Sequence, residues 1–239
     1  PATCRAGCAR TCTLVRQCWD VMRLHPVATT LIQVQLCAYY LAAMYPILDM
    51  YNFWVAMCGE KDAVALVNIF PVVYGTLGAV FNIGGGVLCD RIGVVKFAWL
   101  CGLLQVASAV LVVTGTTFAG QILWLSVWMV YVNAYAVVFF RFAARYAPFE
   151  LFGSFMGLLS TTMTLPQLVL GTPLTVWMAG LYPEPGDVRK YTVIFTALNA
   201  VAGVTTVAML AWFWWEPPPA PGAVLRTEGG RMVVVGREG

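Results

Sequence analysis

Charged residues are scarce in this sequence. Only 10% of its 239 residues are Asp, Glu, Lys or Arg, whereas a soluble domain usually carries about a quarter. Apolar residues make up 60%, and the mean hydropathy is +0.78. A soluble domain of this length can bury a core without so much apolar surface. The composition therefore indicates an integral membrane protein, with the lipid bilayer as a partner.

Histidine is nearly absent, and the net charge is small. The only histidine, His25, lies at the boundary of the first long apolar run. No His/Asp or His/Cys cluster is embedded in the apolar sequence, so acid–base and metal chemistry have few suitable groups. We therefore expect no enzyme, no metal site and no cofactor. A net charge of +3 gives no support for binding to nucleic acid.

What the sequence does contain is long runs without charge. A membrane-spanning helix needs about 20 mostly apolar residues, because the hydrocarbon core is about 30 Å thick. The runs are apolar on all sides, whereas the strands of a membrane barrel alternate between apolar and polar residues. The expected spanning helices lie in 27–48, 63–89, 97–140 (two helices), 151–181 and 191–215. The sequence predicts an all-α membrane protein with a six-transmembrane-helix bundle over residues 26–216.

Two of these runs carry internal breaks. The run over 97–140 is too long for one helix, and a turn-forming cluster from Thr114 to Gly120 divides it. In the run over 151–181, we expect Pro166 and Pro173 to kink the helix, because proline has no amide hydrogen to donate. A proline also frees a carbonyl one turn earlier, which makes a polar point at membrane depth.

The basic residues are unevenly distributed between the two sides of such a bundle. Cytoplasmic loops of membrane proteins carry an excess of Lys and Arg. One side would hold Lys61, Arg189 and Lys190. The other would hold Arg5, Arg10, Arg16, Arg23, Arg91, Lys96, Arg141, Arg145, Arg226, Arg231 and Arg237. We therefore expect residues 1–25 to be a basic cytoplasmic segment, residues 217–239 a disordered cytoplasmic tail, and both termini to be cytoplasmic.

Half of the eight cysteines lie in the basic segment, at Cys4, Cys8, Cys12 and Cys18. A helical stripe of small packing residues accounts for them, and reversible palmitoylation beside a membrane is a second interpretation. A metal site is the least favoured, because no histidine lies among them.

The segment from Gly86 to Lys96 joins the second and third expected helices. Asp90 closes one helix where the chain leaves the lipid, and Gly93 permits a tight reversal that keeps the two helices adjacent. A carboxylate here can also face the partial positive charge at the N-terminus of a neighbouring helix. Such contacts hold one conformation until they break, although an ordinary charged hairpin is the alternative. The candidate gating residues are Gly86, Asp90, Arg91 and Gly93.

The same loop resembles a known motif. Its pattern G-x-x-x-D-R-x-G, from Gly86 to Gly93, is similar to the loop motif of the major facilitator superfamily of transporters. That motif usually continues with two basic residues, where this chain has Val94 and Val95 before Lys96. The departure is typical of the second copy of the motif, which lies in the C-terminal half of these transporters.

The start of the fifth expected helix carries a second resemblance. The family's order of a proline, an acidic residue and two glycines is met at Pro148, Glu150, Gly153 and Gly157. The two glycines also permit close packing of helices. Residues 149–159 further resemble the branch of solute carriers that transports large neutral amino acids, and related protozoan nutrient transporters.

The resemblance implies a transporter of twelve helices, built from two six-helix bundles with nested inverted repeats. In this chain a basic segment precedes the first expected helix, a polar tail follows the last, and the sequence begins at Pro1 instead of Met. These features suit the C-terminal half. We therefore expect a fragment, or a half-size protein, whose partner is an N-terminal six-helix half.

In that family the first and fourth helices of a half line the central cavity, and the second and fifth flank it. Polar side chains on these helices are candidates for contact with a solute, because a buried polar group needs a partner. Asn133 and Tyr135 are the leading candidates, because they lie in the middle of a cavity helix. The candidate substrate-binding residues are Gln35, Tyr39, Asn68, Tyr131, Asn133, Tyr135 and Gln167. For each, the alternative is a hydrogen bond between helices or an anchor at the membrane interface. Gln105 and Asn199, on peripheral helices, are ranked as packing contacts.

Embedded charge is absent from the expected spans. The only carboxylate close to membrane depth, Asp49, lies either in the interface or in an outer gate or proton relay. Proton-coupled carriers commonly embed Asp, Glu or His, so facilitated diffusion of a neutral or zwitterionic solute is favoured. The sequence predicts alternating-access transport of a small polar solute, an amino acid or otherwise a sugar or other organic solute. A membrane sensor or interaction protein on the same fold is the alternative from another functional class.

Overall fold

The structure is a computed structural model that describes residues 2–184, 187–219, 224–228 and 231–235. It is almost entirely helical. The elements are α1 (Ala2–Leu24), α2 (Pro26–Leu48), α3 (Met50–Cys58), α4 (Glu60–Ile92), α5 (Val94–Thr114), α6 (Phe118–Tyr146), η1 (Phe149–Leu151), α7 (Phe152–Pro166), η2 (Gln167–Gly171), α8 (Thr172–Leu181), α9 (Arg189–Trp215), β1 (Val224–Glu228) and β2 (Arg231–Val235).

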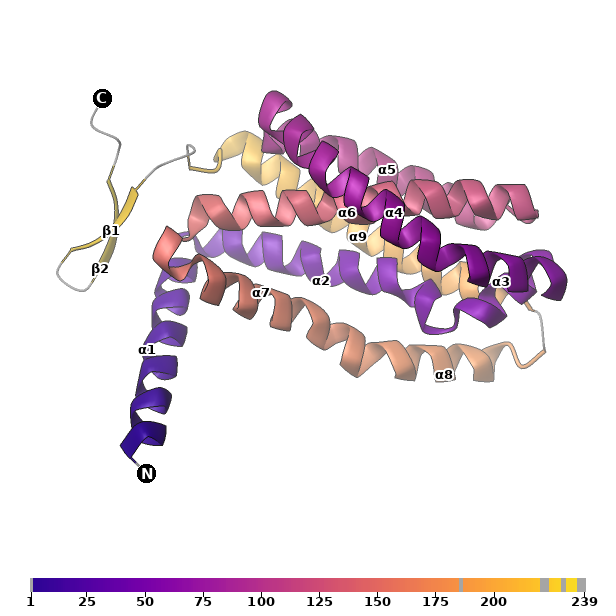
Figure 1. Cartoon of the computed structure of the whole chain (residues 1–239), viewed down its shortest axis with the longest axis horizontal. Helices are drawn as coiled ribbons and strands as arrows, with labels where there is room; N and C mark the ends of the chain where they lie inside the picture. Colours follow the sequence, from indigo (N-terminus) through magenta and orange to yellow (C-terminus); the bar gives the residue numbers. More distant parts are fainter. Residues whose placement is uncertain (1, 185–186, 220–223, 229–230, 236–239) are drawn as a thin grey trace.

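Five helices are long and apolar enough to cross a membrane: α2, α4, α5, α6 and α9. Figure 1 shows them running together along the long axis of the molecule. The helices α2, α4 and α9 each begin within three residues of the start of the charge-free run that predicted them. The helices α5 and α6 correspond to the two that were expected inside 97–140. The expectation of an all-α membrane protein is therefore met by five helices of spanning length.

The fifth expected helix, over 151–181, is interrupted. It is divided into the α-helix α7, one wide π-helical turn at η2, and the α-helix α8. The disturbance follows Pro166, which has no amide hydrogen for the carbonyl of Thr162 one turn earlier. The backbone stays right-handed through it, with φ −65° and ψ −43° at Gln167 and φ −64° and ψ −48° at Thr172. The helix is thus disturbed directly after Pro166, one of the two prolines at which we expected a kink.

The break inside the run over 97–140 lies where the sequence predicted it. Gly115 follows the end of α5, and Thr117 caps α6 by accepting a hydrogen bond from the Gly120 amide at 3.2 Å. The Gln121 amide group bonds the Gly115 carbonyl and closes the turn. A Cβ added to Gly115 would lie 2.7 Å from the carbonyl oxygen of Leu111, so the turn requires glycine there.

The short helix α3 was not expected from the sequence. Its nine residues are too few to span a membrane, and their pattern gave no boundary signal. Packing holds it in place, because Phe53, Trp54 and Met57 are buried. The Trp54 indole donates to Gln121 Oε1 at 3.2 Å and so ties α3 to the start of α6.

The two flanking segments differ from each other. Residues 2–24 of the basic segment form α1, which crosses the end of the bundle (Figure 1). In the segment 217–239, expected to lack regular structure, β1 pairs antiparallel with β2. Before the hairpin, Pro218 is buried and the Pro219 carbonyl accepts a hydrogen bond from Arg145 at 3.2 Å. The remaining residues of the segment lie outside the described part of the chain.

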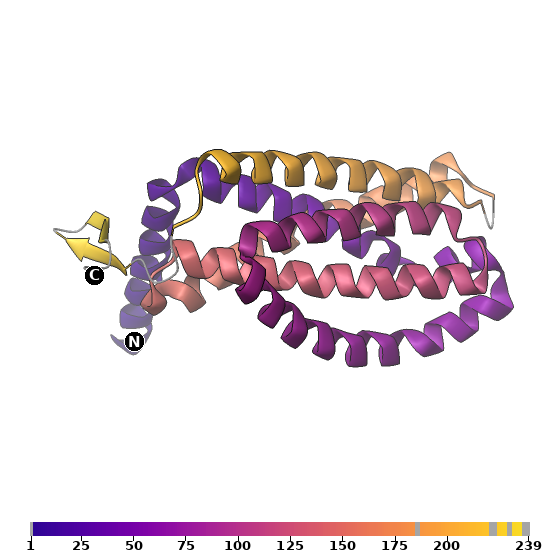
Figure 2. The same cartoon turned by 90° about the horizontal axis from the view of Figure 1, so that it is seen from above.

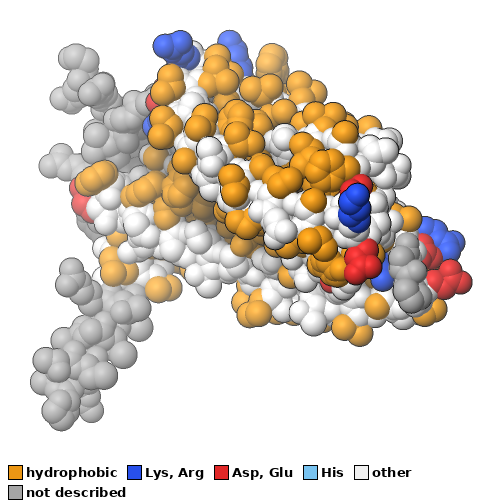
Figure 3. All heavy atoms as spheres, turned by 45° about the vertical axis from the view of Figure 1, so that its right-hand side comes forward, with side chains coloured by type: hydrophobic (Ala, Val, Ile, Leu, Met, Phe, Trp, Pro, Cys, Tyr) orange, Lys and Arg blue, Asp and Glu red, His pale blue; other side chains and the backbone are white. Residues whose placement is uncertain are grey.

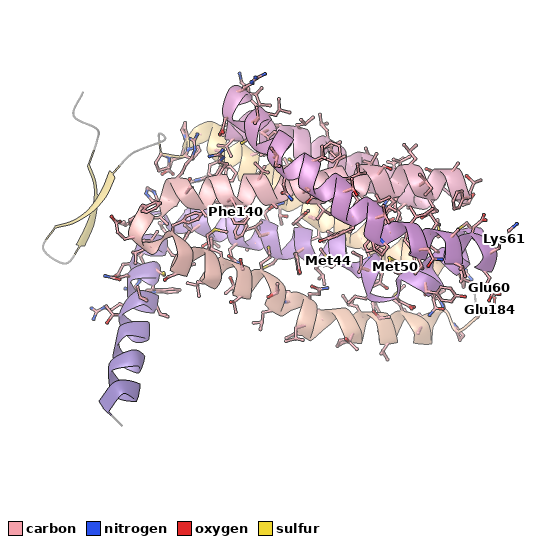
Figure 4. All side chains as sticks on the ribbon, in the orientation of Figure 1. Met44, Met50, Glu60, Lys61, Phe140 and Glu184 are labelled. Carbon is pink, nitrogen blue, oxygen red and sulfur yellow. The ribbon has the colours of Figure 1, made fainter. Side chains whose placement is uncertain are left out.

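Charged side chains gather at the two ends of the bundle. Figure 3 shows a face covered mainly by apolar and uncharged side chains, with charged groups at its top and on its right-hand side. Figure 4 places Glu60, Lys61 and Glu184 at the end opposite to Phe140. The other end holds α1, the α4–α5 turn with Arg91, and the end of α6. This is the distribution of charge that a bundle crossing a bilayer requires.

Candidate functional site

Three candidate tyrosines meet in the interior between α2 and α6. The Tyr39 ring stacks on the Tyr135 ring, with centroids 4.1 Å apart and planes at 19°. It meets Tyr131 edge to face at 5.1 Å. The Tyr39 hydroxyl donates to the Val132 carbonyl at 3.1 Å. All three tyrosines are buried, so the structure brings these predicted residues together as a packed aromatic cluster.

This tyrosine cluster of Tyr39, Tyr131 and Tyr135 retains an unused hydrogen-bonding group. The Tyr131 hydroxyl is buried and has no partner among the described residues, whereas the Tyr135 hydroxyl lies close to the side chains of Gln35 and Thr206. An unpaired buried hydroxyl destabilises a fold by about 1–3 kcal/mol. Such groups are expected where a polar ligand or water supplies the missing bond in another state.

Gln35, also a candidate, faces a different neighbour. It is fully buried, and its side-chain amide donates to the Thr206 hydroxyl on α9 at 3.0 Å. Thr206 also lies 3.4 Å from Gln105 Oε1 on α5. Sequence reasoning missed Thr206, because a single threonine in an apolar helix gives no signal of its partners. The three side chains join α2, α5 and α9, three of the helices of spanning length.

Asn133 belongs to a second polar group on α4 and α6. Its Oδ1 accepts a hydrogen bond from Asn82 at 2.8 Å, and its amide donates to the Met129 carbonyl at 2.8 Å. A Cβ added to Gly78 would touch Asn133 Oδ1 at 3.4 Å, so Gly78 leaves room for this contact. Asn82 is exposed and Asn133 half-buried, so the Asn82–Asn133 pair lies on an open face of the chain.

The two remaining candidates stand apart. Asn68 is exposed on α4, and Gln167 is half-buried in η2. Within the described residues, no hydrogen bond or ring contact joins either of them to the tyrosine cluster. Three of the seven candidates therefore form the tyrosine cluster, Gln35 and Asn133 each bond another helix, and Asn68 and Gln167 stand apart, so the seven do not form one site.

Proline in the fifth expected helix does free a carbonyl, as predicted. The Thr162 carbonyl, one turn before Pro166, has no amide partner from the proline. The Cys37 thiol of α2 takes that place at 3.4 Å. This freed carbonyl thus links α7 to α2.

The candidate gate contains an ion pair that sequence reasoning only half identified. Asp90, in the last turn of α4, lies 2.6 Å from the guanidinium of Arg141 in the last turns of α6. A hollow of about 280 Å³ surrounds them, with Cys89, Gly93 and Arg145 in its wall. Both side chains of the pair are about half exposed, at 58% and 45%.

The two glycines of the gate have different roles. Gly93 has φ +88°, a left-handed conformation that favours glycine, and its amide bonds the Cys89 carbonyl at 2.9 Å. This confirms the tight reversal predicted between α4 and α5. Gly86 lies within α4, where a Cβ would meet nothing within 4 Å. Arg91 is exposed beside them.

The opposite end of the bundle has its own contacts between helices. Tyr191, at the start of α9, donates to Asp49 at 2.7 Å, and Asn52 donates to the second oxygen of that carboxylate at 2.7 Å. The Tyr45 hydroxyl donates to the Lys190 carbonyl at 3.2 Å. Asp49 therefore joins the end of α2 to α9.

A third charged contact is local. Arg189 lies 2.7 Å from Asp187, two residues earlier. Its hydrogen bonds hold the pKa of the Asp187 carboxyl below its usual range. This pair joins no two helices, in contrast to Asp90 and Arg141.

Neither a family model, nor a curated protein, nor a solved structure matches this chain.

Proposed function

We propose that this chain forms one six-helix half of a transporter that moves a small polar solute by alternating access. The resemblance of the loop from Gly86 to Gly93 to the major facilitator superfamily supports this function. The five helices of spanning length supply five of the six membrane crossings. The half with which this one would pair is a further six-helix bundle.

The sixth crossing in this proposal is the composite of α7, η2 and α8. Its backbone is right-handed from Phe152 to Leu181, which corresponds to about 45 Å at about 1.5 Å per residue. A length of about 30 Å is sufficient to cross the hydrocarbon core. A helix interrupted at membrane depth is tolerated where neighbouring groups bond the freed carbonyl, as Cys37 does for Thr162.

The Asn82–Asn133 pair is the observation that carries the proposal. Two amide side chains bond each other on an open face, within two helices of spanning length. Polar groups at membrane depth are expected against a water-filled cavity or another protein surface, and not against lipid. α4, which carries Asn68 and Asn82, is also the least buried of the five helices. A cavity shared with a second half accounts for this exposed polar face.

The two ends of the bundle provide contacts suited to gating. The pair of Asp90 and Arg141 joins α4 to α6 at one end, and Asp49 with Tyr191 joins α2 to α9 at the other. In an alternating-access cycle such contacts bias the ratio of the two conformations. The end that holds α1 and most basic residues would face the cytoplasm, by the excess of Lys and Arg there.

The proposed solute is neutral or zwitterionic, with an amino acid as the first candidate. The polar groups available to it are amides and hydroxyls, such as those of Asn133, Tyr131 and Tyr135. These groups bind a solute through hydrogen bonds and carry no charge that would demand a counter-ion. Movement down a gradient needs no embedded proton carrier. The absence of embedded charge from the expected spans therefore supports facilitated diffusion.

An asparagine pair of matched geometry tests the proposal. Asn133 and Asn199 both donate to the carbonyl four residues earlier, at 2.8 and 2.9 Å, but only Asn133 also bonds another helix. In the full-length protein, Asn133→Ala should raise the KM for uptake roughly tenfold, because a hydrogen bond to a charged solute group contributes about 1.5–3 kcal/mol.

Asn199→Ala should leave that KM within about twofold of the wild-type value, because the Asn199 side chain bonds only its own helix. Loss of such a bond lowers the stability of the protein by about 0.5–1.5 kcal/mol and does not affect binding of the solute. Equal KM values for the two variants, at equal amounts of folded protein in the membrane, would remove Asn133 from the transport path.

A further inference from the structure

α1 is fixed across the end of the bundle. Figures 1 and 2 both show this helix crossing the long axis along which the spanning helices run. Cys18 and Val21 are buried at 1% and 0% exposure, in the main core of the bundle. At the junction with α2, the Thr29 hydroxyl bonds the His25 carbonyl at 2.8 Å. The His25 ring meets Tyr146 edge to face at 5.2 Å.

A helix in this position lies in the plane of the membrane surface. If α2 and its neighbours cross the bilayer, a helix perpendicular to them at one end runs along the interface. Its side chains suit that place, because Val15 and Trp19 are exposed at 53% and 51%. Tryptophan is enriched at the level of lipid headgroups, where its ring has an apolar body and a polar edge.

A groove of about 500 Å³ separates α1 from the bundle. Its walls are mostly apolar. They are formed by Val15, Arg16, Trp19 and Met22 of α1, Gln33 of α2, and Leu158, Leu159 and Thr162 of α7. Leu158 to Thr162 lie about 9–15 Å along the helix axis from Phe152, at about 1.5 Å per residue. The groove therefore runs from the surface helix to the depth of lipid acyl chains.

Positive charge lies in the wall of this groove and beside it. Arg16 is exposed and lines the groove itself. The Arg23 guanidinium lies 5.6 Å from the centre of the Trp19 ring. The sequence of α1 holds four arginines and a single acidic residue, Asp20. The planar guanidinium group matches the geometry of a phosphate and can bind two of its oxygens.

We propose that the groove between α1 and α7 is a binding site for an anionic phospholipid. The phosphate lies at Arg16 and Arg23, and the acyl chains lie against the apolar wall of α7. An anionic lipid is favoured over a neutral one, because Arg16 lines the groove, Arg23 lies against Trp19 of its wall, and no acidic group among the described residues lines it. This site is independent of transport and depends only on membrane insertion of the bundle.

Native mass spectrometry of the detergent-released, full-length protein tests this proposal. Phosphatidylglycerol should be retained as one tightly bound lipid per chain in preference to phosphatidylcholine. Arg16→Gln with Arg23→Gln should weaken phosphatidylglycerol binding roughly twentyfold, since each basic residue near an anionic lipid surface contributes roughly fivefold. Thr162→Trp, which fills the groove without changing charge, should displace the lipid as well.

Lys61→Gln with Lys190→Gln is the matched control, because it removes two positive charges from the opposite end. It should leave phosphatidylglycerol binding unchanged. Three results would overturn the proposal: equal retention of the two lipids, an unchanged affinity in the double arginine variant, or an equal loss in the double lysine variant. Should Thr162→Trp fail to fold, the comparison of the two double variants decides the question alone.

Discussion

Asp90 and Arg141 lie 51 residues apart in the sequence, and their side chains meet at 2.6 Å. The contact joins the last turn of α4 to the last turns of α6, at the end of the bundle that also holds α1. It places a charge pair between a helix that would flank the transport path and one that would line it. The pair is half exposed to solvent, so it can form and break without leaving a buried charge.

Breaking this pair should change transport more than stability. An exposed ion pair contributes about 0.2–1 kcal/mol, and a shift of that size in a two-state equilibrium changes the ratio of conformers by up to about fivefold. Asp90→Asn and Arg141→Gln should therefore alter the initial uptake rate by up to about fivefold, in the same direction, without lowering the amount of folded protein.

The exchanged pair, Asp90→Arg with Arg141→Asp, should bring the uptake rate back toward the wild-type value. Asp187→Asn breaks a local pair of similar length and should leave the uptake rate unchanged. A double variant no better than the single ones would show that the two residues do not act through each other.

The two glycines of the same loop should respond in opposite ways to alanine. Gly93 has φ +88°, so Gly93→Ala should lower the free energy of unfolding by about 1 kcal/mol. Gly86 lies in a helix with open space around it, so Gly86→Ala should raise that free energy by up to about 1 kcal/mol. Thermal unfolding of the purified protein in detergent measures both. Equal destabilisation by the two changes would contradict the roles assigned to them.

The tyrosine cluster allows a comparison of two hydroxyl groups. The Tyr39 hydroxyl bonds the Val132 carbonyl, whereas that of Tyr131 is buried without a partner among the described residues. Tyr39→Phe should destabilise the protein by about 1 kcal/mol, and Tyr131→Phe should stabilise it by about 1 kcal/mol. If the Tyr131 hydroxyl contacts the solute, Tyr131→Phe also raises the KM for uptake. Melting temperature and uptake, measured on the same preparations, separate the two effects.

Thr206 should matter more than its neighbour Thr205. Both hydroxyls bond the Ala202 carbonyl, at 2.7 and 2.9 Å, but only Thr206 also accepts a hydrogen bond from Gln35. Thr206→Val should lower stability by about 1 kcal/mol, because it removes a hydrogen bond between helices and leaves a buried amide unpaired. Thr205→Val should have no measurable effect on the melting temperature. A similar loss from both would mean that the bond to Gln35 contributes nothing.

The spanning helices could be predicted because lipid imposes a simple requirement. A segment that crosses the hydrocarbon core must be long, apolar and free of charge, and the runs over 27–48, 63–89 and 191–215 meet that condition in sequence alone. The break from Thr114 to Gly120 was also readable, because turn residues have local signals. The helix α3 had no such signal, since the packing of Phe53 and Trp54 places it.

Partners of side chains were harder to predict than helices. Gln35 was a candidate for a cavity or for a hydrogen bond between helices, and its bond to Thr206 could not be predicted, because the rotation of a helix about its axis depends on all of its neighbours. Asp90 was identified from its local pattern, but its partner Arg141 was not, because helix packing alone brings the two together. Asn133 was a candidate from its place in the sequence, and only its 2.8 Å contact with Asn82 shows that the two form one group.

Solute counterflow tests the central claim most directly. Proteoliposomes of the full-length protein are loaded with an unlabelled neutral amino acid, and the labelled one is added outside without any ion gradient. A facilitative carrier that works by alternating access should accumulate the label transiently inside, and Asn133→Ala should reduce that accumulation at low solute concentration. Folded, membrane-inserted protein that shows no counterflow of any neutral amino acid or hexose would contradict the transport function and favour a membrane sensor or interaction protein.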